Sequence, residues 1–187
     1  MDLMEAHGLA MTEFDRRVRA IGPDQWSLGT PCREWSVRDL VGHLVYEQLW
    51  APELLAGCTP AQVGDRFDHD NLGDDPLVAW VLAAAAARET WLEPGALDKP
   101  VQVSFGEITA EDYAWQMTVD LAVHAWDLAR SIGADERIEP ELAEAVLEYV
   151  TEHMPEWDGS GMFEPPMPVA PDADAQTRLI GLLGRKP

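Results

Sequence analysis

The stretch VDLAVHAWDLAR, residues 119–130, places two acids and a histidine inside an apolar pattern of helical period. Asp120 and His124 are spaced i,i+4 and therefore project from one face, and Asp127 follows His124 by three positions. The surrounding pattern predicts a helix that starts near Thr109 or Ala110 and ends at Gly133, a residue typical of helix ends. These polar side chains either lie at the border of the apolar face of a helix or belong to a functional site.

The same periodicity predicts further helices on both sides of this one. Ser36 followed by Asp39 resembles a capping box, and Asp75 before Pro76 is a typical helix start. The predicted helices cover residues 3–20, 36–57 with a bend or break at Pro52, 76–93 and 139–154.

The connecting segments are polar or rich in glycine and proline. Residues 58–75 read as a loop, and the alternation of Val101, Val103 and Phe105 before Gly106 predicts a short hairpin or extended arm. After residue 154 the chain is irregular, with a short helix expected from Ala173 to Leu183. We therefore expect an all-α protein, an antiparallel four-helix bundle over residues 1–153 with an irregular C-terminal tail, 154–187, packed on the same domain.

Composition excludes several classes of partner. The 187 residues carry 13 basic and 34 acidic side chains, a formal charge of -21, without a cluster of lysine or arginine. Nucleic acid and anionic membranes are therefore not expected partners. There is no apolar run of 18 residues and no signal-peptide pattern, and the two cysteines form no CxxC motif. The sequence predicts a soluble cytoplasmic protein.

Two histidines occupy the apolar faces of predicted helices. His43 lies among valine and leucine residues in DLVGHLV, and His124 has Asp120 one turn before it. Neutral imidazole and carboxylate suit Zn²⁺, and two histidines with one carboxylate would leave a position open for water or substrate. The other interpretation is a carboxylate–imidazole hydrogen bond that only fixes a polar layer. A shared zinc requires the two rings to lie within about 5 Å of each other.

Other polar residues lie close to these three in the sequence. Glu47, four residues after His43, is the reserve carboxylate, and Asp127 could ligate or orient His124 from behind. We expect solvated side chains at His7, His69 and His153, and small buried thiols at Cys32 and Cys58. Because the sequence has no Walker loop, GxGxxG turn or GxSxG elbow, the bundle interior is the one candidate site.

Five segments carry a family resemblance: TPCREWSVRDLVGHLV, LGDDP, SFGEITAEDY, VDLAVHAWDLARSIG and RLIGLLGRKP. Together they resemble the N-terminal domain of mycothiol-dependent maleylpyruvate isomerase, within the DinB/YfiT-like superfamily. The resemblance implies an antiparallel four-helix bundle that binds a divalent metal near one end, commonly zinc or nickel. His43 matches the first histidine ligand, and Asp120 with His124 matches an E-x-x-x-H pair, here with Asp in place of the longer Glu.

The resemblance also implies a chemistry. We expect a divalent-metal-dependent enzyme, with Zn²⁺ first and Ni²⁺ as the alternative, that uses a mycothiol-like thiol on an electrophilic substrate in a transferase or isomerase reaction. Relatives suggest a homodimer. The isomerase carries a further domain that the tail is too short to supply, so isomerase activity itself is not implied. The alternatives are a non-catalytic metal-binding or stress-associated helical module, and histidines that never meet a metal.

Overall fold

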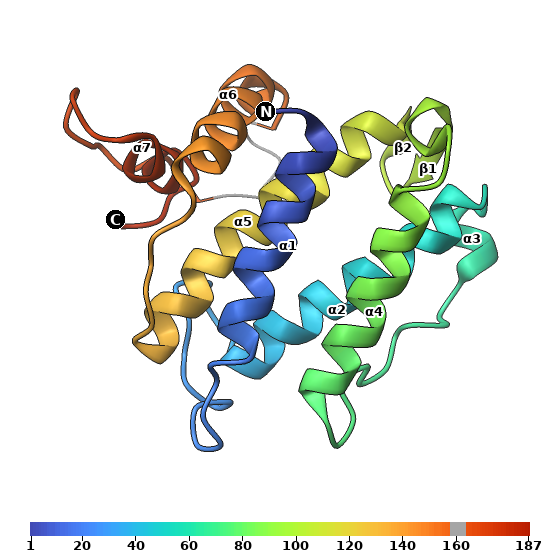
Figure 1. Ribbon diagram of the computed structural model, residues 1–187, viewed down its shortest axis with the longest axis horizontal. Coiled ribbons are helices and arrows are strands. Elements are labelled where there is room, and N and C mark those ends of the chain that lie inside the picture. Colours follow the sequence, from blue (N-terminus) through green and yellow to red (C-terminus); the bar gives the residue numbers. More distant parts are fainter. Residues whose placement is uncertain (158–163) are drawn as a thin grey trace.

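The computed structural model describes residues 1–157 and 164–187, and these are mostly helical. The elements in chain order are α1 Leu3–Val18, α2 Val37–Leu55, α3 Pro60–Val63, α4 Pro76–Trp91, a short 3₁₀ turn Ala96–Asp98, β1 Pro100–Val103, β2 Gly106–Thr109, α5 Ala110–Ile132, α6 Pro140–Trp157 and α7 Ala175–Leu182. Helix α1 runs beside α5 and α2 beside α4, while α6 and α7 pack together at one side (Figure 1). The prediction of a mostly helical protein with a short extended segment is confirmed.

Local capping explains where the helices begin. Ser36 accepts from the backbone N–H of Asp39, and the Asp39 carboxylate accepts from the N–H of Ser36, so the predicted capping box of α2 is confirmed. Asp75 caps α4 as expected. Gly133, with φ 68°, ends α5 in the left-handed conformation that glycine adopts at little cost.

Several elements differ in detail from the sequence predictions, and α4, for example, ends at Trp91 rather than at residue 93. Helix α1 ends at Val18 rather than at residue 20. Pro52 does not interrupt α2, which continues to Leu55. The predicted loop 58–75 contains the short helix α3, because Thr59 caps it and Pro60 occupies its first position. Turn-sized helices of this kind give too few residues for a periodic pattern to reveal them.

The predicted extended arm is an antiparallel hairpin at the start of α5. Val101 pairs with Ile108, and Gly106 turns the chain. The hairpin leads directly into α5, where the Thr109 side chain accepts from the N–H of Asp112. This cap fixes the start of the helix that carries Asp120 and His124.

The core fills the space between the paired helices. Trp80, Trp91 and Trp126 are almost completely buried in it. From the tail, Leu179 and Ile180 join the same core cluster as α1, α2 and α5. The antiparallel four-helix bundle and the division of the chain at residues 153 and 154 stay predictions. Among the described helices none is long and apolar enough to cross a membrane.

His7 corrects a prediction, because it is fully buried on α1 and not solvated. Arg88 of α4 donates to His7 Nδ1 at 2.9 Å and to the carbonyl of Met4. Burial, followed by the positive charge of Arg88, lowers the pKa of His7 to about 3. The imidazole is therefore neutral in the folded protein at any pH near neutrality.

The buried His7 should make the protein less stable in mild acid. His7 becomes protonated below about pH 6.5 in the unfolded chain, but only below about pH 3 in the folded protein. Because the unfolded state binds more protons between these two values, the free energy of unfolding decreases as the pH falls from 6.5 to 3. At pH 4.5 the cost is roughly 2 to 3 kcal/mol. Urea unfolding at pH 7 and pH 4.5 should show a loss smaller by that amount in His7→Gln than in the wild type. Equal losses in the two proteins would contradict it.

Candidate metal centre

Helices α2 and α5 bring together the three residues predicted to bind a metal. Asp120 lies between the two imidazoles: its Oδ2 is 2.9 Å from His43 Nε2, and its Oδ1 is 3.2 Å from His124 Nε2. The ligand atoms of the three side chains all lie within 4.8 Å of one another. Asp120 is thus long enough to reach both rings, even though it is one methylene shorter than the Glu of the family pattern.

Measured between ring centroids, the separation of His43 and His124 exceeds the expected limit of about 5 Å. The ring centroids of His43 and His124 are 5.3 Å apart, and the rings are nearly perpendicular, at 78°. The nitrogens that would bond a metal are closer together than this limit. Zinc–nitrogen bonds in protein sites measure roughly 2.0–2.1 Å.

Asp127 interacts with the other ring nitrogen of His124, Nδ1. The Asp127 Oδ2 lies 2.9 Å from His124 Nδ1, and this carboxylate is fully buried. When Nδ1 carries the proton and donates it to Asp127, Nε2 presents its lone pair toward Asp120 and His43. This is the arrangement that orients histidines in metal sites through a carboxylate behind the ligand.

Three residues near the cluster were missed by the sequence analysis. Cys32 places its Sγ 3.7 Å from His124 Nδ1 and 3.3 Å from Asp127 Oδ2, and Trp35 lies over His43 with 4.9 Å between ring centroids. Both come from a turn closed by the Trp35 N–H and the Cys32 carbonyl, in which Glu34 has φ 68°. Cys32 and Cys58 are both partly exposed, so the predicted burial of the two thiols is wrong.

The third missed residue is Arg185, two positions before Pro187. Its guanidinium Nη2 donates to Asp127 Oδ2 at 3.0 Å and lies 3.6 Å from Cys32 Sγ. Cys32, His124 and Asp127 also form a group with the spacing of metal ligands. The positive charge of Arg185 already lies against Cys32 and Asp127, where a metal ion would otherwise bind. We therefore assign to this group the role of orienting the His124 ring.

Charges around the cluster change the pKa values of its members. Burial alone would raise the pKa of Asp120, but the two imidazoles hold it well below its usual range. Burial alone would lower the pKa of both histidines, yet the Asp120 carboxylate more than offsets this and raises each of them, His124 most. The cluster therefore attracts positive charge, which protons or a divalent cation can supply.

The cluster opens into a cavity of about 1050 Å³. Its lining includes Trp35, Glu47 and Tyr113 close to the cluster, and His153 from α6. His153 is half-buried, its Nδ1 lies 2.9 Å from the carbonyl of Tyr149, and its ring stacks on that of Tyr149, so the prediction of a solvated side chain is wrong. The exposed His69 agrees with its prediction. A cavity of this size is large enough to hold a small molecule.

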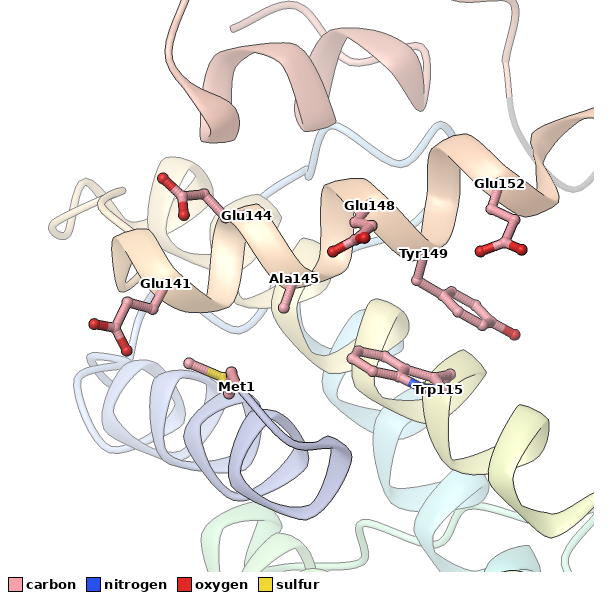
Figure 2. Close-up of a pocket in the computed structure, with 8 residues that line it drawn as sticks. All are labelled: Met1, Trp115, Glu141, Glu144, Ala145, Glu148, Tyr149 and Glu152. Carbon is pink, nitrogen blue, oxygen red and sulfur yellow. The ribbon is translucent and has the colours of Figure 1, made fainter.

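A second cavity, of about 590 Å³, lies between α6 and the start of α1 (Figure 2). Glu141, Glu144, Glu148 and Glu152 project from α6 around it. Trp115 and Tyr149 stack at its edge, with ring centroids 5.2 Å apart and planes 14° apart. The described residues that line it include four glutamates and no histidine, so the chemistry of interest lies in the first cavity.

Comparison with known proteins matches most of the chain to one protein family. The family model described as the mycothiol maleylpyruvate isomerase N-terminal domain matches residues 7–129, which include His43, Asp120 and His124. The chain belongs to this family. Two relatives are uncharacterized proteins of Mycobacterium tuberculosis, Rv0738 of strain H37Rv and MT0763 of strain CDC 1551. Each is 32% identical over 147 residues, which cover 76% of this chain and 74% of the relative.

Two solved structures share the fold of this member of the family. They are crystal structures of the mycothiol-dependent maleylpyruvate isomerase and of a mutant in which a histidine is replaced by alanine. The TM-score is 0.71 for both, with 18% and 17% identity, and the match covers 100% of this chain and 90% of theirs. This coverage corrects the expectation that the isomerase has a large further domain without a counterpart here.

Proposed function

We propose that this protein is a divalent-metal-dependent enzyme that uses mycothiol or a similar small thiol in an isomerase-type reaction on an electrophilic substrate. The metal ligands are His43, Asp120 and His124. The observation that carries the proposal is the carboxylate of Asp120 placed between two imidazole Nε2 atoms, one of them oriented by Asp127. Membership of the isomerase family supports the thiol.

Zinc is our choice of metal, and nickel is the alternative. Two imidazoles and one carboxylate are the ligand types of catalytic zinc sites, in which a fourth position stays open. When bound, such a cation lowers the pKa of a coordinated thiol and holds it as the nucleophilic thiolate. The scaffold we propose is the antiparallel four-helix bundle formed by α1, α2, α4 and α5, with α2 and α5 supplying the ligands.

The residues of the chain hold the reactants. Asp127 and Arg185 fix the ring of His124, and Trp35 covers the imidazoles on one side. The cavity gives the thiol and its substrate a shared space with aromatic walls at Trp35 and Tyr113. Bringing two reactants together in a fixed orientation is itself a large part of catalysis.

The proposal predicts that thiol binding depends on the metal. Mycothiol should bind zinc-loaded protein at least about tenfold more tightly than metal-stripped protein, because a sulfur–metal bond adds more than about 1.4 kcal/mol. Isothermal titration calorimetry on the two forms measures this ratio. Equal affinities would favour the non-catalytic metal-binding module instead. Isomerisation of maleylpyruvate by the zinc-loaded protein with mycothiol is the matching activity assay.

A further inference from the structure

Glu47 stands apart from the three proposed ligands although it lines the same cavity. It lies one helical turn after His43 on α2, and both side chains face the cavity beside Asp120 and His124. Within the described residues it is not part of a metal-binding group, and it makes no ion pair with either histidine. The reserve role as a ligand is therefore not the one that its position favours.

Its surroundings differ from those of the other acid near the cluster. Asp127 is fully engaged, since it accepts from His124 and Arg185. The Glu47 carboxylate makes no side-chain hydrogen bond to any residue in the described ranges 1–157 and 164–187. An acid that has no fixed partner, is partly shielded from water and faces a cavity can exchange a proton with whatever enters.

The protonation of Glu47 suits such an exchange. Burial, followed by the negative charge of Asp120, raises the pKa of Glu47 to about 7. Both the carboxylate and the carboxylic acid are then populated near neutral pH. A carboxyl group of this kind can take a proton in one step and return it in the next.

We infer that Glu47 is the proton acceptor for the small thiol, a role that rests on the proposed function. As the sulfur approaches the His43–Asp120–His124 cluster, the S–H bond breaks, its electron pair stays on sulfur, and an O–H bond forms on Glu47. After the thiolate has added to an electrophilic carbon, Glu47 returns the proton to the adduct. The sequence of steps consumes no oxidant or reductant, because only a proton moves.

The number of protons released when a thiol binds tests this role without an activity assay. Mycothiol is titrated into zinc-loaded protein at pH 7.5 in several buffers of different ionisation enthalpy. A thiol of ordinary pKa carries its proton at this pH and would release about 0.9 proton on binding as thiolate with no acceptor nearby. Wild-type protein should release less than about 0.4, and Glu47→Gln should release close to the full amount.

Controls separate this inference from its alternatives. Glu144→Gln removes an exposed acid of the second cavity and should behave as the wild type does. Each protein should contain one zinc per chain, and loss of zinc from Glu47→Gln would overturn the inference by making Glu47 a ligand. Equal proton release from wild type and Glu47→Gln would also overturn it while leaving the proposed function standing. Absence of mycothiol binding to the zinc-loaded wild type would instead overturn the proposed function.

Discussion

His124→Ala and His43→Ala should each reduce bound zinc from about one ion per chain to below about 0.1. Each substitution removes one of three ligand atoms that lie within 4.8 Å of one another. Loss of a residue that merely orients a ligand already lowers metal affinity by about 10- to 100-fold, and loss of a ligand should cost more. Elemental analysis of protein purified without a histidine tag and dialysed against a weak chelator gives the metal content.

His69→Ala is the matched control for this pair. His69 is exposed in the segment between α3 and α4 and belongs to no metal-binding group within the described residues. Its removal tests whether any histidine contributes non-specifically to zinc retention. Unchanged zinc in His43→Ala and His124→Ala, as in His69→Ala, would show that the carboxylate–imidazole cluster is only a polar layer of the core.

Asp127→Ala should destabilise the protein by about 3 to 5 kcal/mol, the range observed when one partner of a buried ion pair is removed. Asp127 is fully buried and accepts from His124 Nδ1 and Arg185 Nη2. Arg185 has a side-chain exposure of 13%, so its charge would remain partly buried without a partner. Urea unfolding of the metal-free proteins at pH 7 measures the loss.

Two controls show whether the loss of stability in Asp127→Ala comes from leaving the charge of Arg185 buried and unpaired: a variant of a surface ion pair, and a double mutant. Asp135→Ala breaks a pair with the well-exposed Arg137 and should cost much less than Asp127→Ala, because solvent screens an exposed pair. Arg185→Ala combined with Asp127→Ala should cost less than the sum of the single losses, because the double mutant leaves neither charge unpaired. A loss for Asp127→Ala no larger than that for Asp135→Ala would mean that the Arg185 contact stabilises little.

The three proposed ligands could be found in the sequence because helical spacing is a strong local rule. Asp120 and His124 share a face by the i,i+4 spacing, and an apolar stripe placed His43 toward the same interior. Their meeting point required only that two helices pack against each other. Asp120 stands where the family pattern has the longer Glu, so the sequence did not show whether its carboxylate reaches both histidines. In the structure it lies within 3.2 Å of a nitrogen of each ring.

The residues around the cluster could not be found this way. Cys32 and Trp35 lie in a turn whose path depends on a left-handed Glu34, and Arg185 comes from the far end of the chain. Contacts between loops and tails carry no periodic signal, so their partners depend on how the whole chain packs. His7 was misjudged for a related reason, since its burial depends on Arg88 lying against α1 from another helix.

The most direct measurement is the position of zinc in crystals of the zinc-loaded protein, located from its anomalous X-ray scattering. The account predicts one strong site with bonds of about 2.0 to 2.2 Å to His43 Nε2, His124 Nε2 and an oxygen of Asp120. Asp127 should remain on Nδ1 of His124, outside the coordination sphere. Zinc found elsewhere on the protein, with the Asp120 carboxylate still hydrogen-bonded to both imidazoles, would contradict the account.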